Sequence, residues 1–196
     1  MLRVLIAEDE WLVAFTLRGQ LEQRGYQVIG IAKSGAQAIE LCKTERPDVV
    51  LMDISMPGID GLEATRQIMQ QSPTCVVMLT AHGQPHHITK AEEAGVMAYL
   101  IKPVSGDQII PSIEMARRRF EEFLALRNEV VGLQEALETR KLVERARGIL
   151  MERANLSEPA AFRRLQKMAM DRRLSLRAVA EKVITTAETS DEMFQR

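Results

Sequence analysis

Five polar side chains fall at the ends of short apolar runs in the first half of the chain: Glu8 and Asp9, Asp53, Thr80, and Lys102. If these runs are parallel strands of one sheet, their carboxyl ends meet at a single crevice. Three carboxylates held within a few ångströms repel one another unless a hard cation lies among them. Mg²⁺ suits such a site, because it binds one or two carboxylates and keeps water or phosphate oxygens as its other ligands. The pattern therefore predicts a magnesium site at Glu8, Asp9 and Asp53.

The same cluster predicts phosphoryl chemistry at Asp53. A carboxylate can act as a nucleophile and form an acyl phosphate. A cation, the hydroxyl of Thr80 and the ammonium of Lys102 would together hold the oxygens of a phosphoryl group. A single aspartate at a strand end is usually structural, whereas five such groups on four strand ends are not. Asp53 is the predicted phosphoacceptor.

Alternating strands and helices must position these groups. The apolar runs are nearly continuous, which is typical of parallel strands that are covered on both faces; they span residues 2–7, 28–32, 49–52, 76–80 and 98–101. Amphipathic stretches lie between them, over residues 12–24, 36–43, 62–71 and 88–93. The predicted fold class is α/β, with a doubly wound, five-stranded parallel sheet.

The sequence after Pro103 is helical in character. Apolar residues recur there at steps of three and four, namely Ile109, Ile113, Ala116, Phe120, Phe123, Val130, Leu133 and Leu137. This spacing predicts one long helix with a coiled-coil-like seam, which Arg127 and Gln134 interrupt in one register. Two helices with a break near Gly132 are the alternative.

Two shorter helices follow and make a small all-α unit with the end of the long one. Ser157 and Pro159 are suited to the start of a helix over residues 160–172. Ser175 is placed to cap another over residues 176–187.

Composition narrows the class of protein. The chain has 196 residues, of which 46% are hydrophobic and 27% charged, as in ordinary globular proteins. No apolar run is long enough to span a bilayer, so we expect no membrane insertion. Cys42 and Cys75 lack a metal or redox spacing and are expected to be reduced core residues, which favours a cytoplasmic location.

Charge is distributed unevenly along the chain. Residues 1–126 hold 12 basic and 16 acidic residues, whereas residues 127–183 hold 13 and 8. An acidic first part and a basic second part are typical of a switch joined to a module that binds a polyanion. A solvated basic face without a partner would give the same counts.

Residues 1–120 resemble a two-component receiver domain of the flavodoxin-like fold, on the pair Glu8-Asp9, residues 53–61, Thr80-Ala81 and residues 99–103. The resemblance implies phosphotransfer from a sensor histidine kinase to Asp53. It implies that Mg²⁺ is held by Asp9, Asp53 and the backbone carbonyl of Ser55, with Glu8 acting largely through water. Such a protein is not an enzyme in the usual sense, since it catalyses only its own Mg²⁺-dependent phosphorylation and dephosphorylation.

The receiver resemblance also implies a switch. Thr80 and Lys102 would contact the phosphoryl oxygens, and Tyr99 would change rotamer together with Thr80. A cis peptide between Lys102 and Pro103 is expected on the same grounds.

Residues 128–187 resemble an ANTAR domain, the RNA-binding output of amidase and nitrate-assimilation antitermination regulators. The matching stretches are residues 133–140, 144–151, 161–165 and 169–170. This resemblance implies binding to hairpins in nascent RNA and transcription antitermination. Arginine can serve both phosphates and unpaired bases, and the predicted contacts are Arg140, Lys141, Arg145, Arg147, Arg163, Arg164 and Lys167.

The predicted organisation is a receiver over residues 1–120, a long linking helix over 104–135, an RNA-binding domain over 128–187 and a flexible tail over 188–196. We expect phosphorylation to favour a homodimer that buries a seam of the long helix which is partly exposed in a monomer, namely Ile113, Phe120, Phe123, Val130 and Leu137. Packing of this seam within one chain, against the receiver or the short helices, is the alternative. A DNA-binding response regulator and a phosphorylation-switched protein-interaction module remain alternatives. DNA is the weaker of the two, because the last helix carries only Arg177 and Lys182 as cations before its predicted end.

Overall fold

The computed structural model describes the backbone of residues 1–81 and 94–194, and the side chains of residues 1–81 and 94–189. The predicted helix over 88–93 and the three histidines, His82, His86 and His87, lie outside these residues. The chain divides into two compact units, an N-terminal unit, Met1–Ala125, and a C-terminal unit, Leu126–Arg196.

One parallel sheet organises the N-terminal unit, with the strand order β2-β1-β3-β4-β5. Every residue of β3 and β4 is buried, as near-continuous apolar sequence predicts for strands covered on both faces. The predicted doubly wound α/β fold is therefore confirmed. The strands are β1 (Arg3–Ala7), β2 (Gln27–Ala32), β3 (Val49–Asp53), β4 (Cys75–Thr80) and β5 (Ala98–Ile101).

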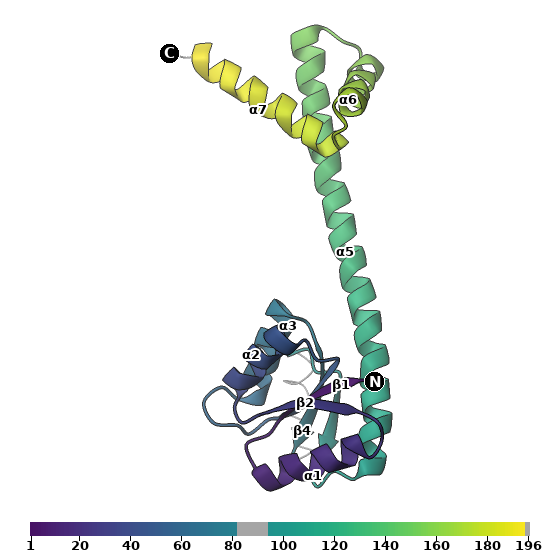
Figure 1. Cartoon of the computed structure of the whole chain (residues 1–196). Coiled ribbons are helices and arrows are strands. Elements are labelled where there is room, and N and C mark those ends of the chain that lie inside the picture. The colour runs from purple at the N-terminus through teal and green to yellow at the C-terminus, as the bar shows by residue number, and fades with distance from the viewer. Residues whose placement is uncertain (82–93, 195–196) are drawn as a thin grey trace. The chain divides into compact units, whose positions relative to one another are not determined.

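Helices cover both faces of this sheet (Figure 1). α1 (Trp11–Glu22) and the first turns of α5 (Gly106–Ala154) contribute to one core, and α2 (Gly35–Glu45) and α3 (Gly61–Gln71) contribute to the other. Successive strand residues point to opposite faces and so serve the two cores in turn. The sheet is thus held from both sides, and the strand ends are left to carry polar groups.

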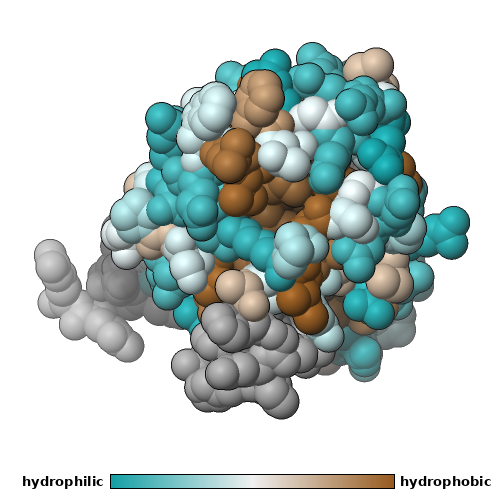
Figure 2. Space-filling model, turned by 90° about the horizontal axis from the view of Figure 1, so that it is seen from below, coloured by the Kyte–Doolittle hydropathy of each residue, from teal (hydrophilic) through white to brown (hydrophobic). Residues whose placement is uncertain are grey.

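The outer side of α1 is unusually apolar. Trp11, Leu12 and Phe15 are between 58% and 69% exposed, and the rings of Trp11 and Phe15 stack with centroids 5.3 Å apart. Beside them is a cavity of about 450 Å³, lined by Leu12, Val13, Thr16, Leu17, Leu79, Lys102, Pro103 and Val104. Figure 2 views this part of the molecule from below and shows apolar side chains gathered around a hollow. Large exposed apolar patches of this kind mark interaction sites.

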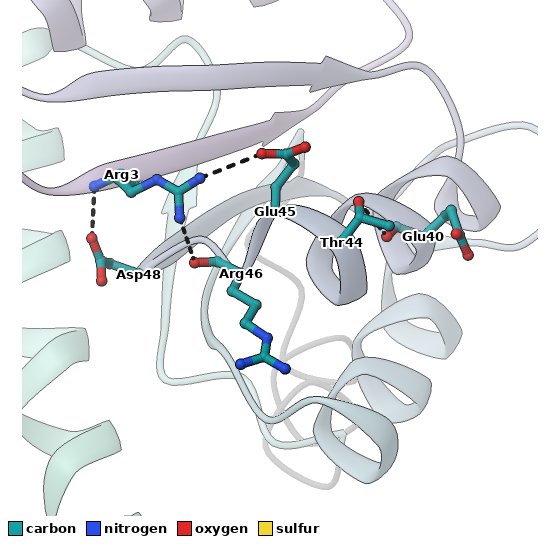
Figure 3. Close-up of polar contacts among 6 residues, drawn as sticks. All are labelled: Arg3, Glu40, Thr44, Glu45, Arg46 and Asp48. Carbon is teal, nitrogen blue, oxygen red and sulfur yellow. Dashed lines mark hydrogen bonds and ion pairs between the residues drawn. The ribbon is translucent and has the colours of Figure 1, made fainter.

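An arginine closes the connection between α2 and β3. Arg3 donates through its backbone N–H to the carboxylate of Asp48 at 2.7 Å, and through its guanidinium to the carbonyl of Arg46 at 3.2 Å and to Glu45 at 3.4 Å (Figure 3). Arg46 itself ends α2 in the left-handed region, with φ 48°. These exposed contacts contribute little energy singly, but they tie the start of β1 to the segment that leads into β3.

Gly61 allows α3 to begin directly against the end of β3. A Cβ atom there would lie 2.0 Å from the carbonyl oxygen of Asp53, which is backbone and cannot move aside cheaply. We expect Gly61→Ala to destabilise the protein by about 2 kcal/mol, as overpacking does, in urea unfolding followed by circular dichroism. Gly19→Ala is the matched control, because a Cβ atom at Gly19 in α1 meets nothing within 4 Å. It is expected to leave stability unchanged or raise it; equal stability of the two variants would contradict the close approach.

α5 is a single helix of 49 residues, Gly106–Ala154, and it does not break at Gly132. The prediction of an uninterrupted helix took no account of Pro111, which lies near its start. Proline lacks an N–H, so the helix forgoes one hydrogen bond to the carbonyl of Asp107 and still continues.

The predicted apolar seam divides into two parts. Ile109, Ile113 and Ala116 are fully buried against the sheet, so the expectation that Ile113 lies on an exposed seam is wrong. These residues are buried because the first turns of α5 cover this face of the sheet. Further along, four residues are between 53% and 64% exposed, and we call them the α5 strip: Leu126, Val130, Leu133 and Leu137.

Three helices make the C-terminal unit: the end of α5, α6 (Glu158–Arg172) and α7 (Leu176–Phe194). Their core contains Val143, Ala146, Leu165, Val179, Ala180 and Ile184. Ser175 caps α7 as predicted, since the N–H of Ala178 donates to its hydroxyl at 3.1 Å. Ser157 occupies the cap position of α6, but its side chain makes no capping hydrogen bond.

α7 continues to Phe194, beyond its predicted end at residue 187 and into the segment expected to be a flexible tail, residues 188–196. Two contacts hold its beginning. Arg145 forms an ion pair with Glu188 at 2.6 Å, and the hydroxyl of Thr189 donates to the carbonyl of Thr185 at 2.9 Å. Polar composition alone therefore placed the end of α7 too early.

Both cysteines are free and buried, as predicted. Burial raises the pKa of each thiol, Cys42 and Cys75, to about 12, so neither is activated as a thiolate. Among the described residues, no helix combines the length and the apolar character that crossing a membrane requires.

Candidate functional sites

The carboxyl ends of β1 and β3 bring three carboxylates together. These strands are neighbours in the sheet, and Glu8 and Asp9 follow β1 while Asp53 ends β3. One oxygen from each side chain lies within 4.8 Å of the others, and we call this set the acidic cluster. Glu8 and Asp53 are only 1% and 5% exposed, whereas Asp9 is open to solvent. Three oxygen donors of this kind, with one side open, fit Mg²⁺ and its remaining water or phosphate ligands.

Lys102 reaches the acidic cluster from β5. Its Nζ lies 2.6 Å from Oε2 of Glu8 and 2.9 Å from Oδ1 of Asp53. The backbone contributes to this position, because the N–H of Lys102 donates to the carbonyl of Thr80 at 2.7 Å, and the following peptide bond to Pro103 is cis as expected. The ammonium therefore bridges the two buried carboxylates.

Burial and charge act against each other here. Burial raises the pKa of Glu8 and of Asp53 above their ordinary values, and the Lys102 ammonium opposes this effect on both. Burial works to lower the pKa of Lys102, but its ion pairs with the two carboxylates outweigh that effect, and the pKa is raised. Lys102 is thus a cation at neutral pH, next to the carboxylate predicted to accept a phosphoryl group.

The remaining predicted receiver residues lie on β4, on β5 and after β3. Thr80 is buried at the end of β4, one strand away from Asp53. Tyr99 lies on β5 opposite Met78 and is 46% exposed. Ser55 follows Asp53 by two residues and is exposed, in the connection that leads to α3. The structure therefore groups Glu8, Asp9, Asp53 and Lys102 in direct proximity, with Thr80 at the next strand end.

The cations predicted to contact RNA fall into two groups. Lys141 pairs with Glu138 at 2.8 Å, Arg145 pairs with Glu188, and Arg147 contacts Glu144 as well as Glu158. The other four form no ion pair with the side chains that the structure describes, and all are exposed: Arg140, Arg163, Arg164 and Lys167. The second group can meet an anion without first breaking a contact.

Three of these exposed cations lie along α6. Arg163, Arg164 and Lys167 border a shallow groove of about 560 Å³, which we call the cationic groove; its other lining residues are Leu156, Ala160, Met168 and Asp171. Their spacing, i, i+1 and i+4, keeps them on one side of the helix. Positive charge along an open groove is suited to a phosphate backbone.

Two features were not predicted from the sequence. One is the apolar side of α1, and the other is a second cavity in the C-terminal unit, rimmed by Arg153, Arg172 and Lys182. These three cations come from three different helices. Only their packing brings them together, so no spacing along the chain would have found them.

Comparisons with known proteins match this division of the chain. Residues 4–114 match the family described as response regulator receiver domain, and residues 132–184 match the ANTAR domain. The transcriptional regulatory protein PdtaR of Mycobacterium tuberculosis is 46% identical over 187 residues, which cover 95% of this chain and 91% of that protein.

Further similarities cover part of the chain. The response regulator UvrY of Escherichia coli is 40% identical over 115 residues, or 58% of this chain and 53% of that protein. The crystal structure of the signal receiver domain of a modulated diguanylate cyclase from Desulfovibrio desulfuricans is similar with a TM-score of 0.58 and 34% identity, covering 62% of this chain and 97% of that one.

Proposed function

The chain belongs to the response regulators that join a receiver domain to a C-terminal ANTAR domain, and from this premise we propose that it binds hairpin RNA under the control of phosphorylation at Asp53 and acts as a transcription antiterminator. The observation that carries the proposal is the pairing of two sites in one chain. The buried acidic cluster with Lys102 lies in one unit, and the cationic groove lies in the other.

The receiver chemistry follows from the groups around Asp53. An oxygen of its carboxylate attacks the phosphorus of a phosphohistidine on a sensor kinase; the new O–P bond forms as the N–P bond breaks, and the electron pair returns to the imidazole. Glu8, Asp9 and Asp53 would hold Mg²⁺, which supplies positive charge beside the transferring group. Lys102 and Thr80 would meet the phosphoryl oxygens. The protein then acts only on its own aspartate, first accepting and later hydrolysing the phosphoryl group.

The apolar side of α1 is the proposed docking surface for the kinase. Trp11 and Phe15 follow the acidic cluster closely in the chain, and the adjoining cavity includes Lys102 itself. A protein that delivers a phosphoryl group to Asp53 must cover this neighbourhood.

Replacement of Trp11 and Phe15 by Ala is expected to slow phosphotransfer from the cognate kinase roughly tenfold, because buried aromatic anchors dominate such interfaces. Labelling by acetyl phosphate, which needs no docking surface, should be unchanged. Met115→Ala, another exposed apolar residue of the same unit, is the control. Equal losses with both donors would mean that the aromatic pair supports the phosphoacceptor site rather than kinase docking.

RNA is the favoured ligand of the ANTAR domain. A DNA-reading helix would need several base-contacting side chains on one face, whereas α7 offers Lys182 and Arg177, and Arg177 pairs with Glu181 at 2.9 Å. The test measures binding to two ligands: a pool of RNA hairpins whose loops are randomised, and a duplex DNA of the same length. Each is measured in the presence and in the absence of beryllofluoride, a mimic of the phosphoryl group. Salt-sensitive retention of RNA alone supports the proposal. Equal retention of DNA favours the DNA-binding alternative, and retention of neither favours the protein-interaction module.

Phosphorylation is proposed to favour a homodimer formed through the α5 strip. Its residues Leu126, Val130, Leu133 and Leu137 follow steps of four, three and four, which is the a/d spacing of a coiled coil. Their exposure leaves an apolar line that a second copy would bury. A dimer would also present two RNA-binding units to adjacent hairpins.

Leu133→Asp is expected to keep the protein monomeric in sedimentation experiments with beryllofluoride, because it buries an unpaired charge in the dimer. The wild type should dimerise under the same conditions. Asn128→Asp adds the same charge outside the strip and is expected to dimerise normally. A wild-type mass that stays constant over a wide concentration range, with and without beryllofluoride, would refute this switch.

A further inference from the structure

A second cavity lies where the three helices of the ANTAR domain meet. It measures about 320 Å³, and we call it the helix-junction cavity. α5 contributes Ile149, Leu150 and Arg153, α6 contributes Met168 and Arg172, and α7 contributes the rest: Lys182, Val183, Thr186 and Ala187. Its volume is at the lower end of the range for ligand-binding pockets.

The lining of this cavity combines an apolar floor with a cationic rim. Ile149, Leu150 and Val183 belong to the margin of the hydrophobic core. Arg153 is held in place by a hydrogen bond that it donates to the carbonyl of Ala187 at 2.8 Å. Arg172 and Lys182 are exposed and form no ion pair with the described side chains. An occupant should therefore have a small apolar body with negative charge attached beside it.

The helix-junction cavity adjoins the cationic groove. Met168 lines both, so the two meet on either side of one side chain of α6. A phosphate backbone that follows Arg163, Arg164 and Lys167 is thereby led to the mouth of the cavity. This continuity favours a nucleotide within a strand over an isolated small molecule.

We propose that an unpaired base from the loop of the bound RNA hairpin inserts into the helix-junction cavity, with its flanking phosphates at Arg172 and Lys182. The inference rests on the proposed RNA binding. Single-stranded RNA is commonly recognised through loop bases that leave the stack, usually against an aromatic side chain. None of the described residues that line this cavity is aromatic, so burial on the apolar floor replaces stacking here.

The test uses the hairpin from the randomised pool that the wild-type protein binds most tightly. 2-Aminopurine is placed at each loop position in turn, and the full-length protein is added. Insertion moves one base out of the stack and into a cavity whose described lining contains no aromatic residue, so we expect the fluorescence of 2-aminopurine to rise at a single loop position. An abasic site at that position should weaken binding roughly tenfold.

Variants link that base to the cavity. Val183→Phe fills the floor of the cavity and is expected to lower the affinity for the intact hairpin roughly tenfold. It should not lower the affinity for the abasic hairpin any further, because the substitution and the abasic site remove the same interaction. Lys182→Ala tests the rim with an exposed residue whose replacement leaves the core intact. It should weaken binding several-fold more than Arg177→Ala, which removes the same charge from α7 outside the cavity.

The outcomes separate the two proposals. Failure of the wild-type protein to bind any hairpin would overturn the proposed function itself. Binding without a bright loop position, together with equal affinities of Lys182→Ala and Arg177→Ala, would overturn the base insertion and leave RNA binding standing. If circular dichroism shows that Val183→Phe has lost helicity, the comparison of Lys182→Ala with Arg177→Ala decides whether the base inserts into the cavity.

Discussion

Asp53→Asn is expected to abolish phosphorylation of the protein by acetyl phosphate or by its kinase in the presence of Mg²⁺. The amide keeps the shape of the side chain but lacks the carboxylate charge that attacks phosphorus and binds the metal. Glu8 shares these acidic neighbours and the Lys102 ammonium, but Asp53 alone of the two ends β3, the strand that pairs with β4 and its terminal Thr80. Incorporation of radioactive phosphate, or the mass of the intact protein, measures the effect directly.

Asp60→Asn provides the matched control. Asp60 lies in the same connection between β3 and α3, and its side chain caps α3 by accepting from the N–H of Glu63 at 2.7 Å. Asparagine caps a helix about as well, so this variant should fold normally and be labelled like the wild type. Equal labelling of Asp53→Asn would place the phosphoacceptor elsewhere in the chain.

Replacement of Arg163, Arg164 and Lys167 by Ala is expected to weaken RNA binding at least roughly tenfold and to reduce its salt dependence. Each cation that contacts a phosphate releases a counterion, so losing three contacts should lower the slope of log affinity against log salt by about 2 to 3. The side chains are exposed, and the core residue Leu165 between them is untouched. Affinity measured across a salt series separates this effect from unfolding.

The triple replacement of Arg140, Arg145 and Arg147 is the comparison. These residues also match the ANTAR resemblance, and we expect their loss to weaken binding while helicity is retained. The loss should be smaller, because Arg145 and Arg147 are engaged with glutamates and would have to release them to bind phosphate. A larger loss from this triple would move the main RNA contact from α6 to α5.

The sheet and its polar edge were predictable because they depend on local patterns. Fully buried parallel strands require apolar runs, and the residue that ends each run must lie at the carboxyl edge. Asp53 and Lys102 could be expected to approach one another for this reason alone. Their separation, and the bridging of Glu8 by the same ammonium, depend on side-chain conformations that no spacing specifies.

The helices after Pro103 were predicted less completely, because the spacing of apolar residues along a helix does not reveal which other element covers its apolar face. Ile113 and Leu133 both belong to runs with helical spacing, yet one is buried against the sheet and the other is exposed. Likewise, Arg145 and Arg163 are indistinguishable as basic residues in the sequence. Only the fold places Glu188 beside Arg145, where the two form an ion pair. Packing between elements distant in the chain decided each case.

The middle of α5 is free to change in length. Among the described residues, the core of the N-terminal unit takes nothing from this helix beyond Phe120, and the core of the C-terminal unit begins at Leu142. Insertions or deletions between Ala125, where the N-terminal unit ends, and Leu142 would therefore leave the core of each unit intact. Dimerisation through the α5 strip would restrict them to multiples of seven residues, because any other change turns part of the strip away from its partner. Related chains should accordingly differ in length here by whole heptads, and a shift of one residue should uncouple dimer formation from folding.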